Sequence, residues 1–128
     1  MDTVTGEAKS YATAIITRNA AVALVEAALE AAAGIGIEMA VAVTDNAGNL
    51  KTFGRTDGAP FLTGDVATHK AWTAASYGIP THVWNAYLTG DPKVAQLANI
   101  PRLMPVCGGY PVKEAGTVVG AIGVSGGT

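Results

Sequence analysis

Glycines interrupt the most strand-like part of this sequence and restrict how that part can fold. Residues 117–124 form a β-rich run that contains Gly120 and Gly123, and glycine pairs at 108–109 and 126–127 flank it. Glycine weakens a strand because it has no side chain to pack, so glycines inside strands usually mark a close approach to the backbone. A helix, another subunit or a flat ligand can fill the vacant volume, and we expect a ligand there.

The composition indicates one domain with few charges. The chain has 128 residues, enough for a single domain, 1–128, with its own core. A net charge of −2 gives no positive surface, so we expect neither nucleic acid nor a membrane as partner. Because only 14% of the residues are charged, we expect a homo-oligomer in which other copies cover part of the surface. The alternative is that the apolar excess is alanine, which is tolerated anywhere.

Cysteine content and apolar runs give an expectation for the compartment. A single cysteine, Cys107, excludes an internal disulfide and fits a reducing environment. The first residues lack the basic-then-apolar pattern of a signal peptide, and no apolar run is long enough to span a membrane. We therefore expect a soluble, cytoplasmic protein.

The order of predicted elements indicates an α+β fold. Helices are expected at residues 7–33 and 63–77, with shorter ones starting at Thr81 and at Asp91-Pro92. Strands are expected at residues 39–44, 50–55, 104–106, 109–113 and 117–124. This order predicts a central antiparallel sheet of about five strands with helices packed on it.

Several motifs, taken in order, resemble the GlcG/HbpS-like family of haem-binding proteins, which includes the C-terminal domain of PduO-type proteins. The matching segments are residues 42–50, 55–60, 67–74, 101–105, 108–111 and 119–127. The resemblance implies a profilin-like α/β/α sandwich that assembles into symmetric oligomers. It also implies binding of haem or a corrinoid and a link to small-molecule metabolism.

One departure from the family concerns the C-terminal end. Members usually continue past the Ser125-Gly126-Gly127 segment into a final helix, whereas this sequence stops at Thr128. Either the usual C-terminal helix is missing from this protein, or the sequence is cut short before it. If the helix is missing, one face of the sheet is less covered, and a neighbouring subunit is expected to close it.

Two residues at a predicted strand end are candidates for ligand binding. The guanidinium of Arg55 forms a fork that matches the two oxygens of a carboxylate or a haem propionate, and Asp57 follows in the next loop. The alternative is that Arg55 and Asp57 pair with each other or with a neighbouring subunit.

The predicted helices carry three candidates for chemistry. His69 lies one turn after Asp65, whose carboxylate can fix the imidazole tautomer, so His69 is a candidate general base or haem-iron ligand. The alternative is a solvated His69–Asp65 pair. Lys70 matches the family's helix motif and is a candidate for proton transfer. His82 is a second possible haem-iron ligand, or else a surface or interface residue.

The segment before the last predicted hairpin supplies further ligand-binding candidates. Cys107 is either a small residue at a strand end or a thiolate ligand for haem iron. Gly108 and Gly109 can present backbone N–H groups to an anion, and Tyr110 can form an aromatic pocket wall. We expect these glycines to converge with Arg55, Asp57, His69 and Lys70 on one pocket near a subunit boundary.

Two functions remain open from the sequence. The first is an oligomeric module that binds haem or a related planar or carboxylate-bearing small molecule. The second is a small cofactor-independent enzyme, an isomerase, lyase or hydratase, acting on a carboxylate-bearing metabolite. In that enzyme Arg55 would anchor the carboxylate, and His69 or Lys70 would transfer a proton. A scaffold role is the third possibility.

Overall fold

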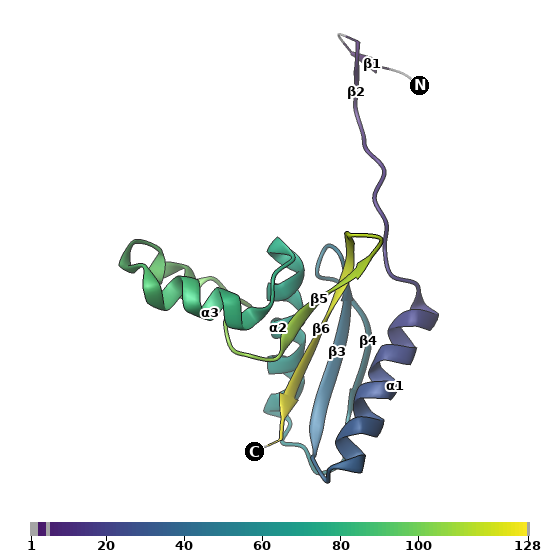
Figure 1. Ribbon diagram of the computed structural model, residues 1–128, viewed down its shortest axis with the longest axis vertical. Coiled ribbons are helices and arrows are strands. Elements are labelled where there is room, and N and C mark those ends of the chain that lie inside the picture. The colour runs from purple at the N-terminus through teal and green to yellow at the C-terminus, as the bar shows by residue number, and fades with distance from the viewer. Residues whose placement is uncertain (1–2, 5, 128) are drawn as a thin grey trace.

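A four-stranded antiparallel sheet with a helix on each face forms the body of the protein (Figure 1). This computed structural model describes residues 3–4 and 6–127. The sheet order is β4-β3-β6-β5. The body comprises α1 (Arg18–Gly34), β3 (Met39–Asp45), β4 (Leu50–Arg55), α2 (Leu62–Tyr77), β5 (Gly109–Glu114) and β6 (Thr117–Gly126). The predicted α/β/α sandwich is confirmed, but the described sheet has one strand fewer than the five expected because residues 104–106 form none.

The two faces of the sheet carry side chains of different size. On β3, Val41 and Val43 point toward α1 and join a core with Val25 of that helix. Ala40 and Ala42 point the other way and pack against α2. This alternation is the one that the sequence predicts for a strand buried on both sides. It leaves a thick aliphatic layer under α1 and lets α2 lie close to the sheet.

Helix α2 occupies the space that the strand glycines leave open. A Cβ atom at Gly123 would collide with the carbonyl oxygen of Ala67. A Cβ atom at Gly109 would lie 2.6 Å from both the carbonyl oxygen of Lys70 and the methyl group of Thr81. The expectation that a ligand fills this volume is therefore wrong at these two positions, because the protein's own helices fill it.

The predicted helix over residues 7–33 is wrong in its first third. Glu7–Ala8 form a short strand, β2, which pairs with β1 (Thr3–Val4), and the chain then runs without regular structure up to Thr17. Thr17 caps α1 by accepting a hydrogen bond from the Ala20 N–H at 3.1 Å. Residues 6–15 are all exposed, so alanine's helix propensity has no packing to reinforce it. In Figure 1 this segment leads away from the body.

A helical projection follows α2. It consists of α3 (Thr81–Gly90) and the 3₁₀ helix η1 (Pro92–Asn99), and it extends sideways from the sheet (Figure 1). Both predicted starting points are confirmed, with Asp91 capping η1 at the Lys93 N–H. Thr81 is the first residue of α3 rather than its cap, a position that Pro80 holds. Within residues 6–127, no helix combines the length and apolar character needed to cross a bilayer.

Candidate functional site

Arg55 and Asp57 line two different cavities. Arg55 lies beside Phe53 and Phe61 in a cavity of about 330 Å³ next to the start of α2. Asp57 lines a second cavity of about 430 Å³ near the end of α1, and the two share no residue. The Arg55 Nη1 atom donates a hydrogen bond to the Ala59 carbonyl oxygen at 2.6 Å, which folds the arginine back onto its own loop. The expected convergence of these two residues on one pocket is therefore wrong.

His69 lies half-buried on α2 and lines neither the Arg55 cavity nor the Asp57 cavity. Its neighbour Lys70 points inward to the sheet, and adjacent helix residues differ in direction by about 100°. Among the described residues, no three His, Cys, Asp or Glu side chains gather as a metal-binding group. A purely protein-built metal centre at His69 thus has no geometric support there.

Lys70 is the most deeply buried charged group of the fold. Its side chain is only 6% exposed, and the Nζ atom donates a hydrogen bond to the Val124 carbonyl oxygen of β6 at 2.9 Å. Burial lowers the pKa of Lys70 below its ordinary value of 10.5, while the charge of the nearby Cys107 thiol acts in the opposite direction. Lys70 therefore belongs to the junction of α2 with β6.

Gly108 makes room for the Lys70 ammonium group. Its φ angle of 124° is one that residues with a side chain rarely adopt, and a Cβ atom there would lie 2.9 Å from the Lys70 Nζ atom. The Gly108 carbonyl oxygen also accepts a hydrogen bond from the Val124 N–H at 2.9 Å. The structure thus brings Lys70 together with Gly108 and Gly109, which are three of the residues expected on one pocket, and Cys107 lies nearby.

His82 and Tyr110 face each other across the junction of α3 and β5. Their ring centroids are 6.0 Å apart with an interplanar angle of 57°. Both residues are exposed, as is Cys107, three positions before Tyr110. We call His82, Cys107 and Tyr110 the His82 surface. The Tyr110 ring faces the His82 ring, and Cys107 lies on the loop that leads into Tyr110.

Sequence reasoning missed the residue that links the parts of this surface. Thr81 is fully buried, and its hydroxyl donates a hydrogen bond to the Val106 carbonyl oxygen at 2.5 Å. The same hydroxyl accepts a hydrogen bond from the Gly109 N–H at 2.9 Å. A threonine at the predicted start of a helix reads as a cap, so its sequence position gave no sign of this long-range role.

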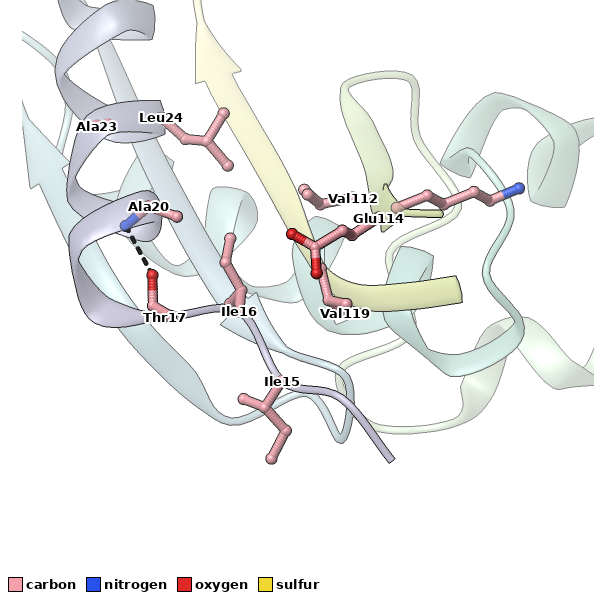
Figure 2. Close-up of a pocket in the computed structure, with 10 residues that line it drawn as sticks. Ile15, Ile16, Thr17, Ala20, Ala23, Leu24, Val112, Glu114 and Val119 are labelled. Atoms are coloured by element: carbon pink, nitrogen blue, oxygen red, sulfur yellow. Dashed lines mark hydrogen bonds between the residues drawn. The ribbon is translucent and has the colours of Figure 1, made fainter. Parts of the chain in front are cut away.

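Sequence reasoning also missed an apolar cavity of about 430 Å³ between the start of α1 and the β5–β6 hairpin (Figure 2). Ile16, Leu24 and Val119 form its walls, and Glu114 lies at its edge. None of the predicted site residues lines this cavity. The one available signal was the Ile15-Ile16 pair just before the α1 cap.

The helical projection carries an aromatic groove. Tyr77, Trp84 and Tyr87 form edge-to-face contacts, with centroids 5.4 Å and 6.3 Å apart, beside a groove of about 360 Å³. Tyr77 is 76% exposed and Tyr87 49%, and the buried Trp84 Nε1 atom finds no hydrogen-bond partner among the described residues. Trp72 is half-buried, and the Arg102 guanidinium lies over its ring, 5.8 Å from the ring centroid.

The family model described as "Haem degrading protein HbpS-like" matches residues 16–128. The chain belongs to the HbpS-like family. An uncharacterized 15.0 kDa protein from the dhaT-dhaS intergenic region of Citrobacter freundii is 36% identical over 122 residues, covering 94% of this chain and 86% of that protein. The resemblance stated from the sequence motifs is thus confirmed.

Two crystal structures of HbpS-like proteins share the fold. Klebsiella pneumoniae protein ORFY superposes with a TM-score of 0.87 at 33% identity, covering 95% of this chain and 86% of that one. A double mutant of HbpS from Streptomyces reticuli superposes with a TM-score of 0.85 at 34% identity, covering 98% and 85%. Together with the family match, these superpositions show that the chain has the HbpS-like fold over most of its length.

Proposed function

We propose that this chain binds haem, or a related planar ligand bearing carboxylates, at the His82 surface. Membership in a family described as haem degrading supports the ligand class. The observation that carries the site is the exposed His82 imidazole with the Tyr110 ring 6.0 Å away. Histidine, cysteine and tyrosine side chains are all ligands of haem iron in proteins, so the donor set at this surface fits the group.

Each residue of the His82 surface has a separate role in this proposal. His82 offers an imidazole nitrogen to the iron, Tyr110 covers a face or edge of the ring, and Cys107 is a competing thiolate ligand. Haem, when bound, supplies a redox-active iron. The chain's own part would be to hold the haem through the side chains of the His82 surface.

The haem propionates need a cationic partner, and within one copy Arg55 is badly placed to be that partner. Arg55 lies on β4 and Tyr110 on β5, at opposite edges of the four-stranded sheet. Three strand spacings separate those edges by roughly 14 Å. A bound ligand would therefore meet Arg55 of another copy, or other cations nearer β5 such as Lys113.

A homo-oligomer is the second part of the proposal. The aromatic groove beside Tyr77 and Tyr87 exposes large apolar rings, and η1 buries none of its residues. Exposed apolar patches of this kind mark contacts between proteins. A second copy packed on the projection would cover these rings.

The enzyme alternative receives less support from the geometry. It needs Arg55 to anchor a carboxylate within reach of His69 or Lys70, yet neither of these residues lines the Arg55 cavity. The Arg55 guanidinium also donates a hydrogen bond to the Ala59 carbonyl oxygen in its own loop.

A cytoplasmic location stays a prediction from the sequence.

Haemin titration tests the ligand and the site together. The chain has two histidines, so His69→Ala is a matched control for His82→Ala. We expect a saturable Soret shift in the wild type and in His69→Ala, and a weakened or altered one in His82→Ala. Wild-type binding unaffected by His82→Ala would remove His82 from the site, and no saturable shift in the wild type would remove haem from the proposal.

A further inference from the structure

Residues 100–108 contain no helix or strand, yet side chains hold them in place. The Thr73 hydroxyl accepts a hydrogen bond from the Met104 N–H at 2.8 Å, and the Asn85 amide donates one to the Pro105 carbonyl oxygen at 2.9 Å. Further along, Thr81 bonds to both Val106 and Gly109. Side chains of α2 and α3 therefore pair the backbone groups of this loop with hydrogen bonds, as a neighbouring strand pairs the backbone groups of a strand in a sheet.

Thr81 holds the part of the loop that carries the His82 surface. Its two hydrogen bonds bracket Cys107, and they end on Gly109, the residue before Tyr110. The hydroxyl donates its proton to the Val106 carbonyl oxygen and accepts a hydrogen bond from the Gly109 N–H, so one side chain pairs both backbone groups. Because His82 directly follows Thr81, one buried residue fixes both halves of the surface.

We infer that Thr81 is the positioning residue of the His82 surface: it holds Tyr110 beside His82 and fixes the backbone on both sides of Cys107, so that the bound ligand meets one geometry. This inference rests on the proposed function. Thr81 does not touch the ligand, since it is fully buried. It acts through the segment from Val106 to Gly109.

Two variants of Thr81 separate the effect of its hydroxyl from the effect of its side-chain shape. Thr81→Val keeps the volume but removes both hydrogen bonds, whereas Thr81→Ser keeps the hydroxyl and removes the methyl group. Thr73→Val is the matched control, because Thr73 is equally buried and its hydroxyl holds the other end of the same loop. If Thr81→Val does not fold, as judged by circular dichroism, Thr81→Ala carries the same prediction.

The first measurement needs no haem. Cys107 is the one cysteine of the chain, so the rate of its reaction with a disulfide reagent reports on this loop alone. We expect Thr81→Val to react about fivefold faster or more, since a loop without these two hydrogen bonds moves more and presents the exposed thiol to the reagent in more orientations. Thr81→Ser and Thr73→Val should stay within about twofold of the wild type. Equal rates in Thr81→Val and the wild type would overturn the inference.

The second measurement is haemin affinity together with the Soret and electron paramagnetic resonance spectra. We expect Thr81→Val to bind about tenfold more weakly, with a mixture of iron ligands, because unpaired buried backbone groups favour a loop that moves. Thr81→Ser should restore a single spectrum. A faster thiol reaction with unchanged affinity and spectrum would leave Thr81 as a structural residue and overturn the positioning role.

The two measurements also distinguish this inference from the proposed function. Wild-type protein that does not bind haemin ends the proposed function and the positioning role with it. The thiol rates still decide whether Thr81 holds the loop. A wild type that binds haemin, with equal affinity and spectra in all Thr81 variants, ends the inference alone.

Discussion

The two faces of the sheet pack their helices in opposite ways. On the α2 side, alanines and glycines let the backbone of the helix touch the backbone of the strands, as at Gly123 and Ala67. On the α1 side, larger side chains such as Val43 fill a thicker layer, and an apolar cavity remains beyond the start of the helix. Where α2 meets Gly123 the contact leaves no volume for a ligand, whereas the edge where α3 meets β5 carries the exposed His82 and Tyr110 rings.

The largest expected effect is the difference in lost stability between two glycine-to-alanine variants, one on each face of the sheet. Gly123→Ala puts a Cβ atom into the Ala67 backbone, which cannot give way, so we expect a loss of about 4 kcal/mol or more. Gly54→Ala on the α1 side meets the tip of the Leu29 side chain at 2.8 Å, which can rotate, so about 1–2 kcal/mol is expected. Urea denaturation of both variants measures the difference. Similar losses would mean that the two faces do not differ in rigidity.

An intermediate effect is expected on the open projection. Tyr87→Glu places a charge in the aromatic groove, so we expect the oligomer to dissociate with the monomer still folded. Thr89→Glu is the control, since Thr89 is exposed on α3 and does not line the groove. Light scattering coupled to size exclusion gives the mass. A wild-type monomer would refute the interface, as would an oligomer that Tyr87→Glu leaves intact.

The smallest expected effect is the pH dependence from Lys70 on the α2 side. Burial lowers the pKa of Lys70 in the folded state, so the unfolded chain binds the proton more tightly between that lowered pKa and 10.5. Stability therefore rises with pH over this window, because folding no longer buries the charge. We expect the free energy of unfolding of the wild type to rise relative to Lys70→Met as pH approaches 10.5. If the difference between the two free energies of unfolding does not change with pH, the buried Lys70 ammonium is already well solvated in the folded state.

Short-range patterns predicted most of the fold. The strands predicted at residues 39–44 and 50–55 correspond to β3 and β4, and the helix predicted at 63–77 corresponds to α2. The exception is the segment before Thr17, where alanine content suggested a helix. Whether a helix forms there depends on packing by distant residues, which composition does not contain.

The candidate site was less predictable because it depends on contacts between residues far apart in the chain. The grouping of Lys70 with Gly108 followed from the sequence motifs, but the hydrogen bonds from Thr81 span 25 and 28 positions. From the sequence, the glycines of β6 predict a volume that a ligand fills. A glycine has the same sequence signature whether a helix or a ligand approaches it, and only the position of α2 distinguishes the two.

The side-chain hydrogen bonds that hold residues 100–108 have a consequence for how this protein tolerates changes in length. Surface loops ordinarily accept inserted or deleted residues at small cost. Here the spacing between Met104, Val106 and Gly109 must match fixed hydroxyls at Thr73 and Thr81, so one extra residue would break the match. This irregular loop should therefore resist insertions as strongly as the interior of a strand does.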